Sequence, residues 1–74
     1  MTLDELEKNK IATILDITAS GLLLQKLYDM GFIHGTKVEL IRASPLNDPI
    51  EIQILSYKIT LRREEAKAIK VKYE

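Results

Sequence analysis

The chain contains no cysteine and no tryptophan, and it has only three glycines and two prolines in 74 residues. Without cysteine there is no disulfide framework, no thiolate nucleophile and no cysteine-based zinc or iron–sulfur site. The glycines Gly21, Gly31 and Gly35 stand in neither a Gly-Lys-Ser/Thr loop nor a GxGxxG fingerprint, so no cradle for nucleotide phosphates is predicted. We therefore predict no catalytic site and no cofactor-binding site, and we expect that the protein is not an enzyme.

Neither sign of charge is in excess, because Lys plus Arg and Asp plus Glu each number 11. A protein that neutralises DNA or RNA phosphates normally carries a positive surplus, so nucleic acid is not the expected partner. The longest apolar run, from Gly21 to Leu24, is far shorter than the roughly 18 residues of a membrane span. The acidic N-terminal stretch lacks the basic and apolar regions of a secretory signal. We expect a cytoplasmic protein that does not insert into a membrane.

What the chain does contain is enough apolar sequence for one small core, since 46% of its residues are hydrophobic and 30% are charged. Alternating and β-branched residues predict five strands: Ile11 to Ile17, Thr36 to Ala43, Ile50 to Ile54, Lys58 to Arg62 and Ile69 to Tyr73. The segment Ser44 to Pro49 has two prolines and an Asn-Asp pair, which favour a surface loop. The next hairpin is expected to turn at Ser56-Tyr57.

One helix is predicted over Leu22 to Met30, with Ser20 as its N-cap. Gly31 is expected to end this helix in the left-handed conformation, with Phe32 packing back on Leu27. Single helical turns are predicted at Leu3 to Leu6 and at Arg63 to Lys67. The elements together predict a single domain over residues 1–74, mainly β with one short helix, folded as a small SH3-like, partly open five-stranded barrel.

The predicted helix has an apolar arc that is wider than its own core requires. On a helical wheel the arc is centred near Leu27 and ends at Leu24 and Tyr28 on one side. We expect Leu27 to be buried against the strands, and Leu24 and Tyr28 to stay partly exposed as a partner-binding patch. The alternative is that the Pro45 to Pro49 loop or the N-terminal turn covers them.

His34 is the single imidazole of the chain, between Ile33 and Gly35. One histidine with scattered carboxylates is not a coordination set, so we interpret His34 as a solvated turn residue and predict no metal site. A metal ion bridged by His34 of two molecules is the alternative.

Three segments carry a resemblance to a known family: Leu27 to Val38, Ala43 to Ile50 and Leu61 to Ala66. They hold a leucine-rich helix ending in Gly, a second Gly four residues later, a proline loop with Asp-Pro-Ile, and Leu-Arg before Glu-Ala. In this order and spacing they resemble the FeoA family of ferrous iron transport proteins, over most of the chain from Ile11 to Val71.

The resemblance implies a cytoplasmic accessory protein that binds and regulates the ferrous iron transporter FeoB at its cytoplasmic part. It also implies, by family likeness alone, that a transition metal such as ferrous iron is a possible ligand. A metal-sensing SH3-like domain related to the C-terminal domain of iron-dependent repressors is the alternative. An SH3-like module for proline-rich peptides is a third hypothesis, but three tyrosines and one phenylalanine supply few residues for an aromatic groove. The oligomeric state stays open.

Overall fold

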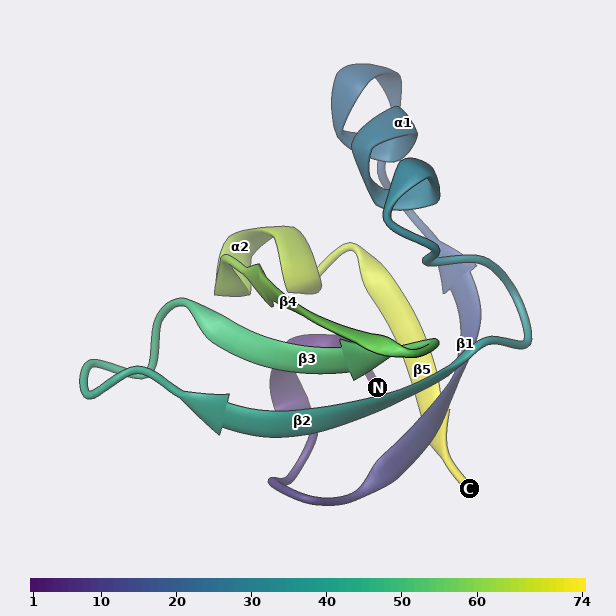
Figure 1. Ribbon diagram of the computed structural model, residues 1–74. Coiled ribbons are helices and arrows are strands. Elements are labelled where there is room, and N and C mark those ends of the chain that lie inside the picture. Colours follow the sequence, from purple (N-terminus) through teal and green to yellow (C-terminus); the bar gives the residue numbers. More distant parts are fainter.

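The computed structural model describes residues 1–74 as a curled antiparallel sheet with short helical segments at its margins (Figure 1). The strands are β1 (Ile11–Ile17), β2 (Lys37–Ala43), β3 (Ile50–Ile54), β4 (Tyr57–Leu61) and β5 (Ile69–Tyr73). The helical elements are the 3₁₀ turn η1 (Leu3–Glu5) and the helices α1 (Gly21–Asp29) and α2 (Arg63–Ala66). All five predicted strands and all three predicted helical segments are confirmed.

The strand order is β4-β3-β2-β1-β5, and every neighbouring pair is antiparallel. The pairing shifts between Ile14 and Asp16 in β1 and between Leu40 and Arg42 in β2. Such irregularities bend and twist a strand, which lets a small sheet curl around its own core. Strands β4 and β5 do not pair with each other, so the barrel stays open between them, as predicted.

The core consists of 15 buried residues, all of them hydrophobic. Alternate residues of the strands supply most of it, and Phe32, Leu27 and Ala66 come from the helices and their ends. The turn η1 and its C-cap contribute Leu3 and Leu6, and the predicted docking of these two leucines is confirmed by their burial. No charged or polar side chain is buried, so the interior requires no ion pair or bound ion to compensate it.

One local prediction was wrong by one residue, and the predicted N-cap position of Ser20 is confirmed. The β3–β4 hairpin turns at Leu55-Ser56, one residue earlier than predicted, so that Tyr57 already belongs to β4. Leu55 carries a φ of 54°, a left-handed conformation usually taken by Gly or Asn, which is why no turn signature was visible in the sequence. Ser20 does stand at the N-cap of α1, but its side chain makes no capping hydrogen bond and the helix begins at Gly21.

None of the helices has the length and the apolar composition that crossing a bilayer requires.

Candidate docking surface

Helix α1 projects from one end of the barrel (Figure 1), and its C-terminal end fixes its position. Leu27 is 0% exposed and is the one fully buried residue of this helix. Directly after the helix, the Phe32 N–H donates to the Leu27 carbonyl at 3.0 Å, and the Gly31 N–H donates to the Tyr28 carbonyl at 3.0 Å. These two bonds form a Schellman cap, which needs a left-handed residue; Gly31 has a φ of 98°. The predicted helix end is confirmed.

The tip of the β3–β4 hairpin also contacts the C-terminal end of α1 at Met30 and Gly31, which we call the Gly31 joint. The Tyr57 hydroxyl donates a hydrogen bond to the Met30 carbonyl oxygen at the end of α1. The Leu55 side chain lies close to Gly31, so closely that a Cβ at this position would touch it. Leu55 and Tyr57 were not singled out in the sequence, because no motif marks a side chain that packs on a distant glycine.

A third attachment links α1 to α2. The Lys26 ammonium lies 2.6 Å from a Glu65 carboxylate oxygen, and the other oxygen of Glu65 accepts the Arg62 N–H at 3.1 Å. The Lys26 hydrogen bond is the main cause that lowers the pKa of the Glu65 carboxyl below its ordinary value of 4.5, while partial burial opposes it. Glu65 therefore stays ionised and holds the outer flank of α1 towards the barrel.

The opposite flank of α1 is free and apolar. Tyr28 is 51% exposed and Leu24 is half-buried, and we call these two residues the α1 apolar edge. The edge is continuous with the Gly31 joint, because Tyr28 stands one turn before Gly31, where the 63% exposed Leu55 packs. The β2–β3 loop, which includes Pro45 to Pro49, lies at the far end of the sheet from α1 (Figure 1). The expected burial of Leu27 and the partial exposure of Leu24 and Tyr28 agree with the structure, and their role in partner binding stays a prediction.

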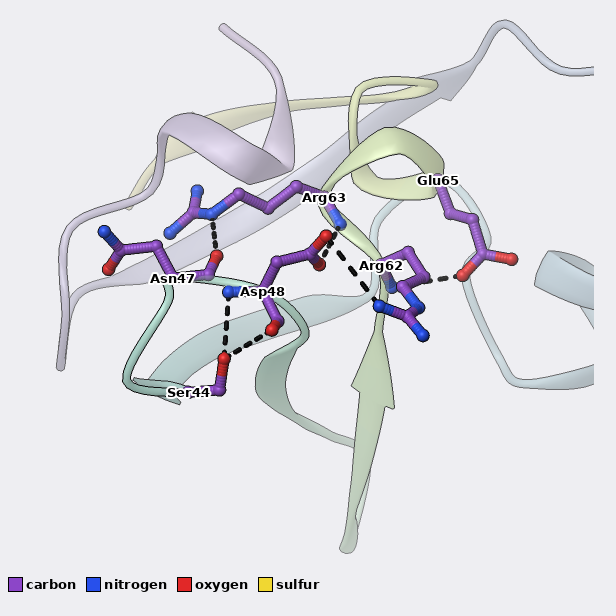
Figure 2. Close-up of polar contacts among 6 residues, drawn as sticks. All are labelled: Ser44, Asn47, Asp48, Arg62, Arg63 and Glu65. Atoms are coloured by element: carbon purple, nitrogen blue, oxygen red, sulfur yellow. Dashed lines mark hydrogen bonds and ion pairs between the residues drawn. The ribbon is translucent and has the colours of Figure 1, made fainter.

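The β2–β3 loop has a different role, which Figure 2 shows. The Arg63 main-chain N–H donates to Asp48 Oδ1 at 3.0 Å, and its guanidinium donates to the Asn47 carbonyl (Figure 2). The guanidinium also donates to the Asp4 carbonyl at 2.7 Å. The Asp48 N–H donates to Ser44 Oγ at 3.0 Å, which closes the loop on itself. Arg63 therefore joins the loop, η1 and α2, and the motif residues here serve the fold rather than a free binding site.

The residues that could ligate a metal ion are scattered over the structure. No three side chains of the types His, Cys, Asp and Glu come together as a ligand group. His34 lies exposed in the turn between α1 and β2, as predicted. The largest surface hollow, about 580 Å³, is lined by Glu7, Asn9, Lys10, Ile11, Tyr73 and Glu74 beside the C-terminus, and no residue of α1 lines it. The surface around α1 is therefore the strongest candidate for function.

Comparison with known proteins gives the family. A family model described as the FeoA domain matches residues 1–73. The chain belongs to the FeoA domain family. It is 35% identical over 71 residues to an Fe(2+) transport protein A/Fe(2+) transporter FeoB fusion protein of Porphyromonas gingivalis. That match covers 96% of this chain but 8% of the fusion protein, so the chain spans a small part of the relative's length.

Solved structures confirm the fold. Iron(II) transport protein A of Clostridium thermocellum superposes with a TM-score of 0.95 at 40% identity, covering 99% of this chain and 45% of that chain. FeoA of Stenotrophomonas maltophilia, described as an SH3 domain protein complexed with zinc, gives a TM-score of 0.86 at 28% identity, covering 97% of this chain and 89% of that chain. The predicted SH3-like FeoA fold is therefore confirmed, and with it membership of a family associated with ferrous iron transport.

The same fold also occurs in a manganese-dependent transcriptional repressor, which superposes with a TM-score of 0.89 at 18% identity and covers 100% of this chain and 36% of that chain. At this identity the likeness shows the fold alone. The alternative of a metal-sensing, repressor-related domain accordingly stays a prediction.

Proposed function

We propose that this FeoA-family protein is a non-catalytic accessory of ferrous iron uptake that acts in the cytoplasm by binding the FeoB transporter. The fusion relative carries the proposal, because it joins a homologous domain and FeoB in one polypeptide. Covalent linkage holds two binding partners at a high effective concentration, which favours pairs that work in contact. Contact with FeoB requires a docking surface on the FeoA-like domain.

The α1 apolar edge is the proposed docking surface. Tyrosine and other large apolar side chains are enriched at the centres of protein interfaces, where they bury much area at a small entropic cost. Tyr28 and Leu24 present such groups on a projecting helix, and Leu27 supports them from the core. We propose that Leu24 and Tyr28 contact the cytoplasmic part of FeoB directly, and that FeoB transport activity responds to this contact.

The decisive variant is Tyr28→Glu, because half of this side chain is already in water and a carboxylate there does not enter the core. We expect a near-native fold, together with loss of binding to full-length FeoB in lipid nanodiscs and loss of ferrous iron uptake in cells. Leu24→Glu is expected to act in the same way with some loss of stability, since Leu24 is half-buried.

The matched control is Leu46→Glu, which makes the same change of charge at a leucine that is 88% exposed in the β2–β3 loop. This variant is expected to bind and support uptake as the unmodified protein does. A folded Tyr28→Glu/Leu24→Glu double variant that still bound FeoB would move the interface away from α1. Absence of any binding by the unmodified protein would contradict the function itself.

A further inference from the structure

The sheet has two outer strands, and only one of them is covered by another part of the chain. On the free side of β5 the N-terminal segment forms a bridge from Thr2 to Lys70, and the Val71 N–H donates to the Met1 carbonyl at 2.9 Å. Strand β4 pairs with β3 and with no other segment. Its second side is therefore an open sheet edge.

The hairpin geometry identifies which main-chain groups point out of this edge. Ile54 and Tyr57 flank a two-residue turn, so they form a hydrogen-bonded pair, and such pairs recur at every second residue. By this alternation Ile59 and Leu61 also bond to β3, whereas the N–H and C=O groups of Lys58 and Thr60 point away from it. Lys58 and Thr60 are both exposed, and neither takes part in the main-chain bonds of turns, loops and caps.

The two faces of the open edge differ in chemistry. The side chains of Lys58, Thr60 and then Arg62 follow one another on the outer face. Lys58 has no ion-pair partner, and the 68% exposed Arg62 side chain approaches Asp48 only to 4.0 Å. On the inner face stand the exposed Tyr57 and the half-buried Ile59, at the rim of the core. The edge is cationic outside and apolar inside.

We propose that the free edge of β4 binds an extended segment of FeoB as an additional strand. The occupant has acidic residues opposite Lys58 and Arg62, alternating with apolar residues that pack on Ile59 and Tyr57. Strand addition of this kind takes its affinity from main-chain hydrogen bonds and its specificity from alternate side chains. The identity of the partner rests on the proposed function; the chemistry of the segment rests on the edge.

A second copy of this chain fits the edge poorly. Pairing of β4 with β4 of another molecule brings Lys58 and Arg62 of both copies onto one small edge, and like charges on paired strands destabilise the pairing. A lysine on an edge strand is a common device against such self-association. An acidic segment is attracted by the same cations. Charge therefore favours pairing of β4 with an acidic partner segment over pairing with a second copy of this chain.

The edge also adjoins the α1 apolar edge. Tyr57 begins β4 and donates its hydroxyl to the Met30 carbonyl at the end of α1. A partner that covers Tyr28 therefore comes near the start of β4. The two surfaces together form one continuous interface.

The test uses the outward N–H of Thr60, which Thr60→Pro removes without removing a β3–β4 hydrogen bond. Proline is tolerated on an edge strand where the N–H faces solvent. The control is Thr60→Val, which keeps the N–H and the strand preference. Proline at position 60 leaves one acceptor of the incoming strand unpaired. Thr60→Pro is therefore expected to bind full-length FeoB in nanodiscs at least about fivefold more weakly. Thr60→Val is expected to bind FeoB as tightly as the unmodified protein does.

Two further measurements keep the test valid if Thr60→Pro proves unstable. Hydrogen exchange on the unmodified protein is expected to slow at the amides of Lys58 and Thr60 when FeoB binds. Reversal of the outer charges in Lys58→Glu/Arg62→Glu is expected to weaken binding at least about tenfold. The control Lys10→Glu/Lys72→Glu makes the same change of net charge just before β1 and on β5, and is expected to leave binding unchanged.

The outcomes separate this inference from the proposed function. If Tyr28→Glu abolishes binding while Thr60→Pro binds normally and the two amides stay unprotected, the strand proposal is overturned and the proposed function stands. If the protein is a dimer in solution and Thr60→Pro makes it a monomer, the occupant is a second copy and the proposal is wrong. If the unmodified protein binds no FeoB, both fall.

Discussion

Replacing Gly31 by alanine tests the joint that positions α1. At a φ of 98° a side chain costs roughly 1–2 kcal/mol through steric strain. The new Cβ would also lie 3.1 Å from Leu55 Cδ1 and 3.3 Å from the Tyr57 hydroxyl, so the hairpin tip must move. Reduced freedom of the unfolded chain returns about 0.4–1 kcal/mol. With about 1 kcal/mol for the displaced contacts, we expect a net loss of about 1–3 kcal/mol.

The assay is thermal unfolding followed by circular dichroism, with urea titration for the free energy. In a domain of this size each kcal/mol lowers Tm by about 4–8 °C, so 2 kcal/mol corresponds to about 8–16 °C. Gly35→Ala is the matched control, because Gly35 has a φ of 89° but no atom within 4 Å of a Cβ. It isolates backbone strain from crowding. Equal losses for the two variants would show that the hairpin contact contributes nothing, and an unchanged Tm for Gly31→Ala would refute the strained joint altogether.

Three further predictions concern the core, the pH dependence and metal. Leu27→Ala, which empties a fully buried site, is expected to cost about 2–5 kcal/mol in urea unfolding and to weaken FeoB binding only as far as it unfolds the protein. The pKa of Glu65 is lowered in the folded state, so its ion pair with Lys26 stabilises the folded protein at pH values above 4.5, the ordinary pKa. This stabilisation is lost as the pH falls through the folded pKa. Glu65→Gln is therefore expected to be less stable than the unmodified protein at neutral pH and to approach its stability in acid. The protein is expected to fold without metal, since its core is wholly apolar, and loss of dispersed amide NMR signals on adding a chelator would contradict this.

The sequence predicts well the elements that bury one row of side chains in the core. Strand β1 and strand β5 have the predicted bounds, and Gly31 ends α1 as its position indicated, because burial and a left-handed cap leave few alternatives. The hairpin turn was displaced by one residue because Leu55 adopts a left-handed φ without being Gly, Asn or Asp. No local sequence pattern marks that conformation.

The candidate surface likewise has features that the sequence predicted and features that it did not. A helical wheel was sufficient to place Leu27 in the core and Tyr28 at its margin, since both follow from one helix alone. The attachments of α1 were not predictable, because Lys26 meets Glu65 and Met30 meets Tyr57 only after the barrel has formed. The role of Arg63 is of the same kind: its guanidinium binds carbonyl oxygens, which every residue carries and no sequence pattern marks.

The open edge of β4 is one of the surface features through which we propose that so small a domain acts. With every buried residue hydrophobic, the interior offers no group for chemistry. Specificity must then come from what the fold leaves unsatisfied outside, which here is a half-exposed tyrosine, a row of free main-chain groups and two cations. The hydrophobic pattern of the strands determines the core whichever residues stand on that edge. The edge residues can therefore change to suit a partner without changing the fold. A FeoA-family chain with the same core but an acidic β4 edge would accordingly be expected to bind a segment of the opposite charge.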